Sequence, residues 1–187
     1  MKTSIITVTY NAEATIERTL ESVARQTYPD IDHLVIDGAS KDRTVEIARR
    51  YPHAIVVSEP DKGLYDAMNK GIRLATGNYL CFLNAGDMLH SKETLAHIAT
   101  TCKANEVTGT MPAILYGDTH IVDANGHFLR NRRLTPPRHL TWRSFKEGML
   151  VCHQAFYVNR QIVLPYDLQY RFSADFDWCI RCLQESE

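Results

Sequence analysis

The first 90 residues repeat one order of apolar and polar positions. Short runs rich in β-branched and other apolar residues predict buried strands at residues 4–9, 33–36, 54–57 and 79–83. Between them, apolar residues recur at spacings of three and four, which predicts helices at about residues 12–26, from about 42, and at about 64–75. This alternation predicts an α/β fold with a mostly parallel central sheet and helices on both faces.

Acidic residues follow three successive predicted strands. Asp37 ends the second strand, Asp61 lies just beyond the third, and Asp87 follows the fourth. The carboxyl ends of parallel strands share one edge, where ligands bind in open α/β sheets. Each acid taken alone is also typical of a helix cap or a turn. Three acids at one edge favour a binding site for ribose hydroxyls or a hard cation.

The loops of this half lack two common nucleotide-binding sequences. No G-x-G-x-x-G follows the first strand, so a dinucleotide-binding turn is not predicted. The sequence G-x-x-x-x-G-K-[ST] is also missing, which argues against a P-loop enzyme. The acids therefore indicate some other kind of ligand site.

The pattern becomes less regular after residue 90. The predicted elements are a helix capped by Ser91 and short strands at residues 114–116, 120–122, 127–129 and 151–158. We expect one domain over residues 1–187, with a binding half at 1–90 and a mixed, substrate-specific half at 91–187. The last apolar stripe ends after barely two helical turns, so we expect a C-terminal portion to be missing.

Polar residues of the second half also have ordinary structural explanations. Asp175 and Asp177 precede a helix, where the helix dipole favours acids. His153, in an apolar strand, fits a hydrogen-bonded core histidine. Residues 130–146 hold six Lys or Arg and no Asp or Glu, which is typical of a solvated loop. A diphosphate ligand would nevertheless need positive charge of this kind.

The amino-acid composition argues against several classes of protein. A net charge of −1 argues against a general nucleic-acid binder. Five cysteines, an odd number lying mostly in apolar runs, favour reduced thiols in a cytosolic protein. No apolar run approaches the ~20 residues of a membrane-spanning helix. We therefore expect a cytoplasmic protein, at most peripherally associated with the inner face of the cytoplasmic membrane.

Six sequence blocks follow one another along the chain: SIITVTYN, VIDGASKDRT, SEPDKGLYDAMNKG, FLNAGD, CHQAFY and SADFDW. In this order and spacing the chain resembles family 2 glycosyltransferases of the GT-A fold, of the bacterial polysaccharide-biosynthesis type. The third block, together with NAGD, HQ and the late acid, is similar in particular to the colanic-acid-type transferases. The resemblance covers essentially all 187 residues and implies the Rossmann-like GT-A fold.

This resemblance implies a donor site at the strand ends. The residues that it assigns to nucleotide-sugar binding are Thr9, Tyr10, Asp37, Asp61, Lys62, Asp66, Asn69 and Asn84. Asp87 matches the last acid of the family's metal motif and would bind Mg²⁺ or Mn²⁺. Many relatives carry further acids where this chain has Asn84 and Gly86, so Asp87 stands alone here. A single carboxylate is compatible with Mg²⁺, which keeps several waters.

The resemblance also implies the groups that act on the acceptor. Asp175 matches the late acid that serves as general base. Trp178, one turn further on, would help to shape the acceptor side. His153 and Gln154 match a recurrent pair and are acceptor-side or phosphate candidates.

The implied reaction is inverting transfer of a hexosyl or deoxyhexosyl group from a UDP-, GDP- or dTDP-linked donor. The acceptor would be a hydroxyl of a saccharide or lipid-linked saccharide, in the biosynthesis of a capsule or other cell-surface polysaccharide. A nucleotidyltransferase would instead carry a glycine-rich basic loop after the first strand, where this chain has Tyr10-Asn11-Ala12-Glu13. A non-catalytic nucleotide-sugar-binding module stays open as the alternative.

Overall fold

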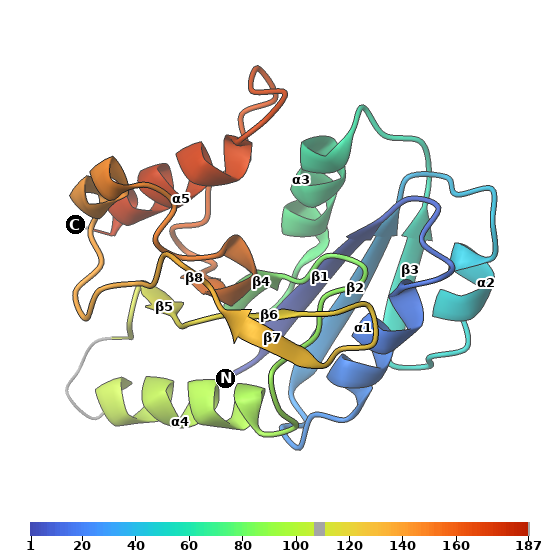
Figure 1. The fold of residues 1–187 in the computed structure, drawn as a ribbon, viewed down its shortest axis with the longest axis horizontal. Coiled ribbons are helices and arrows are strands. Elements are labelled where there is room, and N and C mark those ends of the chain that lie inside the picture. The colour runs from blue at the N-terminus through green and yellow to red at the C-terminus, as the bar shows by residue number, and fades with distance from the viewer. Residues whose placement is uncertain (107–110, 187) are drawn as a thin grey trace.

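A six-stranded sheet forms the centre of the molecule, in the order β3-β2-β1-β4-β8-β5 (Figure 1). The computed structural model describes residues 1–106 and 111–186. The parallel strands are β1 (Thr3–Thr9), β2 (Ile31–Asp37), β3 (Ala54–Ser58) and β4 (Tyr79–Phe82). Next to β4, β8 (Phe156–Asn159) runs antiparallel both to β4 and to β5 (Ile114–Tyr116). The predicted α/β fold with a mostly parallel sheet is confirmed.

Helices cover both faces of this sheet (Figure 1). The helices α1 (Ile16–Ala24), α2 (Thr44–Ala48) and α4 (Thr94–Glu106) supply the apolar clusters of one face. The opposite face is covered by α3 (Leu64–Leu74) and α5 (Ala174–Glu185). Met68 of α3, Phe82 of β4 and Trp178 of α5 belong to this second core and are fully buried. The core therefore fixes α3 and α5 relative to the end of β4.

The strand register brings the expected acids to one edge. Thr9 pairs with Asp37 across β1 and β2, and Asp37 pairs with Ser58 across β2 and β3. The backbone N–H of Ala85, just past β4, donates to the carbonyl of Val8. All four parallel strands thus end side by side, as the alternation pattern predicts.

The start of α1 differs from the prediction. The helix begins at Ile16 rather than near Ala12, and Asn11 is not its N-cap. Asn11 has a φ of 47°, and its side-chain oxygen accepts the backbone N–H of Lys41 at 2.9 Å. The Asn11 side chain thus binds the loop after β2 rather than the end of α1.

The strand expected at residues 151–158 is also shorter than predicted. A 3₁₀ turn, η2 (His153–Ala155), occupies its first half, because the N–H of Ala155 donates to the carbonyl of Cys152 at 2.9 Å. The strand itself begins at Phe156. The turn sends the side chains of His153 and Gln154 toward the end of β4, where an extended strand would place successive side chains on opposite faces.

The remaining elements lie outside the central sheet. β6 (His120–Val122) and β7 (Phe128–Asn131) form a separate hairpin, and Arg18 of α1 donates to the carbonyl of Ala124 in its turn at 2.7 Å. A 3₁₀ helix, η1 (Trp142–Glu147), packs against α5 through Phe145 and Phe176.

Within the described residues, none of the helices has the length and apolar character needed to cross a membrane.

Candidate active site

A pocket of about 420 Å³ lies at the carboxyl edge of the sheet. Its walls include Thr9 and Tyr10 at the end of β1, Gly38 after β2, Asp61 after β3, and Leu64 of α3. The hydroxyl of Thr9 is buried and has no hydrogen-bond partner among the residues that the structure describes. The pocket has the size of a typical small-molecule site, and three of the expected donor-binding residues line it.

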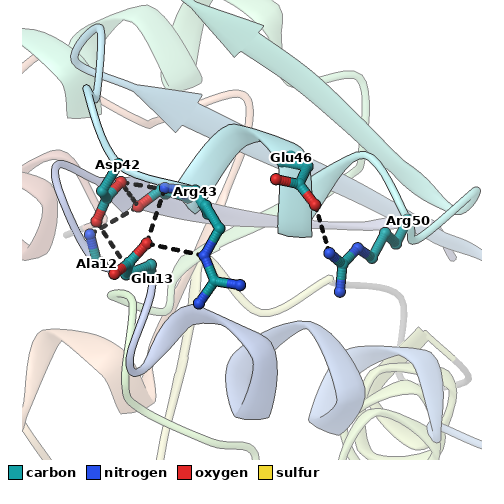
Figure 2. Close-up of polar contacts among 7 residues, drawn as sticks. Ala12, Glu13, Asp42, Arg43, Glu46 and Arg50 are labelled. Carbon is teal, nitrogen blue, oxygen red and sulfur yellow. Dashed lines mark hydrogen bonds and ion pairs between the residues drawn. The ribbon is translucent and has the colours of Figure 1, made fainter.

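The loops after β1 and β2, beside this pocket, are bound to each other (Figure 2). The backbone N–H groups of Ala12 and Glu13 donate to Thr44 Oγ1 at 2.7 Å and to Asp42 Oδ2 at 3.0 Å. In return, the carboxylate of Glu13 accepts the backbone N–H of Arg43 at 3.0 Å and its Nε at 3.3 Å. These contacts, which the sequence reasoning missed, make one rigid unit of the two loops.

Asp37 lies beneath the pocket wall rather than in it. Its side chain is buried, and its Oδ2 accepts the backbone N–H of Ser40 at 2.9 Å and the hydroxyl of Ser58 at 2.7 Å. The hydroxyl of Ser40 donates to its other oxygen. The next residue, Gly38, approaches Asp61 so closely that a Cβ would lie 2.5 Å from Asp61 Oδ2. Asp37 therefore holds the backbone against which Asp61 packs.

The loop between β3 and α3 is fixed by polar contacts of its own. Asp66, in the first turn of α3, accepts the backbone N–H of Lys62 at 3.0 Å. Lys70, one turn further along α3, donates to the carbonyl of Pro60 at 2.7 Å. Lys62 and Asp66 thus belong to the loop that carries Asp61, and Lys70 is an additional support that the sequence did not reveal.

Asp87 follows the tight turn after β4, where Gly86 has a φ of 103°. Its carboxylate Oδ2 accepts the side-chain amide of Gln154, from η2, at 2.9 Å. Its backbone carbonyl accepts the hydroxyl of Thr19, from α1, at 2.7 Å. The expected metal ligand and one of the expected acceptor-side residues are therefore in direct contact.

A second contact chain joins β4, η2 and α5 beside Asp87. The side-chain amide nitrogen of Asn84 lies 3.3 Å from His153 Nε2, and His153 Nδ1 lies 3.2 Å from Asp175 Oδ2. The amide oxygen of Asn84 is buried with no hydrogen-bond partner in the described part of the chain. Three residues singled out from the sequence, far apart along the chain, thus form one connected array.

Tyr65 completes this array and was missed by the sequence reasoning. It lies in the first turn of α3, and its hydroxyl donates to Asp175 Oδ1 at 3.2 Å. The hydrogen bond from His153, more than the one from Tyr65, lowers the pKa of Asp175, although partial burial opposes the shift. Asp175 is therefore an ionised carboxylate at neutral pH, in the state that a general base requires.

Two expected site residues have structural positions instead. Both amide atoms of Asn69 are used on Tyr166, whose carbonyl lies 2.9 Å from Nδ2 and whose N–H lies 2.7 Å from Oδ1. Trp178, expected to shape the acceptor side, is 0% exposed. It stacks on Tyr166, and its ring N–H donates to the carbonyl of Leu164 at 2.6 Å. Both residues support the segment before α5, and neither presents a free polar group to a ligand.

The acidic residues at this edge of the sheet offer few ligands to a divalent cation. In the described part of the chain, no group of three or more His, Cys, Asp or Glu could hold a metal ion. Asp87 nevertheless has one carboxylate oxygen bonded to Gln154 and the other without a protein partner among the described residues. Carboxylate oxygen is the ligand type that Mg²⁺ and Mn²⁺ prefer, and the remaining positions would fall to phosphate oxygens and water.

Sequence relatives of this chain are named glycosyltransferases. A PGL/p-HBAD biosynthesis glycosyltransferase of Mycobacterium bovis is 37% identical over 191 residues, covering 96% of this chain and 68% of the relative. The amylovoran biosynthesis glycosyltransferase AmsB of Erwinia amylovora is 31% identical over 193 residues, covering 95% of this chain and 62% of the relative. The chain thus spans about two thirds of the length of these relatives.

Solved structures share the fold at lower identity. The complex of S. aureus TarS 1-349 with UDP-GlcNAc has a TM-score of 0.78 at 18% identity, covering 99% of this chain and 54% of TarS 1-349. The mannosyltransferase PcManGT from Pyrobaculum calidifontis, in complex with GDP-Man and Mn²⁺, has a TM-score of 0.58 at 21% identity. It is matched over 87% of this chain and 45% of its own. Both likenesses support the GT-A fold.

The family itself is given by the sequence match. Residues 4–165 match the family described as Glycosyl transferase family 2, which covers most of the chain, from β1 to just before Tyr166. The match spans the pocket, Asp87 and the His153-Gln154 pair, and the chain continues to Asp175 beyond it. This chain is therefore a glycosyltransferase domain of the GT-A fold and belongs to glycosyl transferase family 2.

Proposed function

We propose that this domain transfers a sugar from a nucleoside diphosphate sugar to an acceptor hydroxyl, with inversion at the anomeric carbon and with Asp175 as general base. The observation that carries the proposal lies in the first turn of α3. Leu64 lines the pocket, and the next residue, Tyr65, donates to Asp175 at 3.2 Å. The first turn of α3 therefore contacts both a ligand-sized pocket and an ionised carboxylate.

The donor side of the proposal rests on the pocket and on related structures. TarS is described with UDP-GlcNAc and PcManGT with GDP-Man. We infer a UDP-, GDP- or dTDP-linked donor whose nucleoside lies against Thr9, Tyr10 and Asp61. The hydroxyl of Thr9, which has no hydrogen-bond partner among residues 1–106 and 111–186, would supply a hydrogen bond there.

Asp87 is the residue that would hold a divalent cation, Mg²⁺ or Mn²⁺. Bound there, such an ion would neutralise negative charge on the departing diphosphate. Gln154, which donates to Asp87 Oδ2, would orient the carboxylate for that role. The buried amide oxygen of Asn84, three residues before Asp87, has no partner among the residues that the structure describes and would accept a hydrogen bond from the donor.

Asp175 would carry out the proton transfer. The acceptor hydroxyl gives its proton to the carboxylate while its oxygen forms the new bond to the anomeric carbon. The bond between that carbon and the diphosphate oxygen breaks at the same time, and its electron pair leaves with the nucleoside diphosphate. A well-placed general base contributes about 10²- to 10⁴-fold to the rate.

The names of the relatives and the surface charge support our proposal for the acceptor class. The two sequence relatives are named for PGL/p-HBAD and for amylovoran biosynthesis. We infer that the acceptor is a saccharide or lipid-linked saccharide of the cell surface, met at the inner face of the cytoplasmic membrane. In residues 130–146, exposed cations such as Arg133, Arg138 and Arg143 would face an anionic acceptor or surface. Arg132 is instead bound to the backbone carbonyls of Met149 and Leu150.

The test begins with donor binding. Thermal shifts with a panel of UDP-, GDP- and dTDP-sugars identify the donor, and release of the nucleoside diphosphate is then measured with and without EDTA. We expect one donor to raise the melting temperature and to be turned over more slowly in EDTA. Binding without release, in the presence of added Mg²⁺ or Mn²⁺, would support the non-catalytic binding module instead. Failure of every donor to bind would contradict the proposal.

A further inference from the structure

We propose that His153 is the residue that positions Asp175, and that Asn84 holds the His153 ring in the tautomer that carries its proton on Nδ1. The inference rests on the proposed function, in which Asp175 is the base. It gives His153 a role through Asp175, since the ring touches Asp175 and Asn84 and does not line the pocket.

With the amide nitrogen of Asn84 facing Nε2, the contacts of the ring fit a neutral histidine with its proton on Nδ1. An ionised carboxylate only accepts hydrogen bonds, so His153 Nδ1, 3.2 Å from Asp175 Oδ2, must carry a proton. The neighbour of His153 Nε2 is the amide nitrogen of Asn84, at 3.3 Å, which only donates. Nε2 is therefore the acceptor, and the ring is neutral. In a neutral histidine, the hydrogen bonds of the two nitrogens set the tautomer.

The array fixes Asp175 from two sides. His153 donates to Oδ2 and Tyr65 to Oδ1, so rotation of the carboxylate would break both hydrogen bonds. The side chain of His153 is 12% exposed and that of Asp175 is 26% exposed, so water competes little for the ring but reaches the carboxylate. A carboxylate held in this way can meet an acceptor hydroxyl without first being ordered.

The identity of residue 84 decides the charge of the ring. A carboxylate there would face Nε2 with an acceptor and draw a second proton onto the ring. An amide that donates keeps the ring neutral and preserves the net negative charge on Asp175. The amide at residue 84 thus bears on the base as well as on the neighbouring Asp87.

Matched substitutions at residue 153 separate positioning from simple packing. The amide nitrogen of Asn is attached to Cγ, as Nδ1 is, so His153→Asn keeps a donor for Asp175. His153→Gln places its amide nitrogen where Nε2 was, and His153→Leu has no donor. We expect His153→Gln and His153→Leu to lower kcat about 10- to 100-fold, the size of effect that misplaced groups produce, with KM for the donor unchanged. His153→Asn should stay near wild type.

The assay uses the donor found in the thermal-shift panel, with UDP-GlcNAc as the first probe, and measures release of the nucleoside diphosphate. His97→Leu is the control, because it makes the same change at an exposed site on α4. Equal losses of kcat in the Asn, Gln and Leu variants of His153 would overturn the proposal and leave the proposed function standing.

A second measurement does not depend on activity. The ¹⁵N signals of the histidine rings report which nitrogen is protonated, and the signal missing from His153→Asn identifies His153. We expect a proton on Nδ1 and a bare Nε2 at neutral pH in the wild type. In Asn84→Asp, both nitrogens should be protonated. A wild-type ring protonated on Nε2 alone would overturn the proposal, even if no donor in the panel is turned over.

Discussion

The loops beside the pocket are joined by many hydrogen bonds to backbone groups, whereas the residues around Asp175 are joined by single contacts between side chains. In the first region, Glu13 and Asp42 each accept backbone N–H groups of the opposite loop, and buried Asp37 has three donors. In the second, Asp175 depends on one contact from His153 and one from Tyr65.

The contacts of the first region stabilise the fold, whereas those of the second region orient the group proposed to act in catalysis. A backbone group that loses its partner in a buried loop costs stability, because it is left unsatisfied. When a side-chain contact to a partly exposed carboxylate is lost, the carboxylate instead loses its fixed orientation. Substitutions in the pocket loops should therefore change stability and nucleotide binding together, and substitutions around Asp175 should change turnover alone.

The largest effect on turnover is expected from Asp175→Asn. Loss of the general base should lower kcat by about 10²- to 10⁴-fold, with donor affinity unchanged because Asp175 does not line the pocket. Asp177→Asn is the matched control, since that acid is bound to Arg181 at 2.6 Å on the same helix. The measurement is release of nucleoside diphosphate under saturating donor. Equal rates for wild type and Asp175→Asn would remove Asp175 from the mechanism.

Asp37→Ala should give the largest effect on stability. It leaves the hydroxyl of Ser58 and the N–H of Ser40 without their acceptor, which costs about 1–3 kcal/mol of the free energy of unfolding. Binding of UDP should weaken as well, because Gly38 forms part of the pocket wall. Asp61→Ala should also weaken binding, and it should cost less stability than Asp37→Ala because the hydrogen bond that Asp61 accepts from the Gly63 N–H is exposed. Chemical denaturation and calorimetry measure the two quantities, and an unchanged denaturation midpoint in Asp37→Ala would contradict the comparison.

Tyr65→Phe is a smaller change in the second region, around Asp175. It removes one hydrogen bond to Asp175 and keeps the ring that stacks on Tyr166, so we expect kcat to fall about 3- to 10-fold. The free energy of unfolding should not change measurably. Tyr51→Phe, whose ring contacts His53 just before β3, serves as the control. A loss of stability without a loss of kcat would assign Tyr65 to the core rather than to the site.

The two regions also differed in how far the sequence revealed them. The parallel strands and their terminal acids could be predicted, because continuous apolar runs and one strand direction place Asp37, Asp61 and Asp87 at a shared edge. The loop clamp, by which we mean the hydrogen bonds between residues 12–13 and residues 42–44, could not be predicted, since Glu13 and Asp42 bind backbone groups that carry no sequence signal.

Around Asp175, the sequence indicated several residues of the site but not how they are arranged. The apolar letters of residues 151–158 indicate a strand, while the structure forms a 3₁₀ turn that aims His153 and Gln154 at the end of β4. Tyr65 and Asp175 are 110 residues apart, and no periodic pattern links positions so distant. The motif predicts a site role for Trp178, whereas packing buries it.

Asp32, in β2, should make part of the stability of the fold depend on pH. Asp32 is buried, which raises its pKa, but hydrogen bonds from Thr76 and Ser4 outweigh burial and lower the pKa below its ordinary value of 3.8. Its contribution to stability is therefore complete well above pH 3.8 and is lost as the pH falls through the pKa of the folded protein. Denaturation of wild type and Asp32→Asn should differ most near neutral pH and converge in acid. A difference that grows toward low pH would contradict this assignment.

The smallest effects are expected in the contacts of Figure 2, where two glutamates give a matched pair. Glu46 of α2 forms an exposed ion pair with Arg50, just past the end of the helix, so Glu46→Ala should change the free energy of unfolding by no more than about 0.5 kcal/mol. Glu13→Ala removes the acceptor of the Arg43 backbone N–H, which costs about 1 kcal/mol.

The glutamate pair also tests why the loop clamp matters. If the clamp holds the pocket in shape, Glu13→Ala should weaken UDP binding a few-fold, in calorimetry, while Glu46→Ala leaves it unchanged. Equal affinities in both variants would mean that the pocket keeps its form without the Glu13–Arg43 contact. The rigidity of the first region would then come from Asp37 and the strand register alone, because these hold the same loop ends from below the pocket.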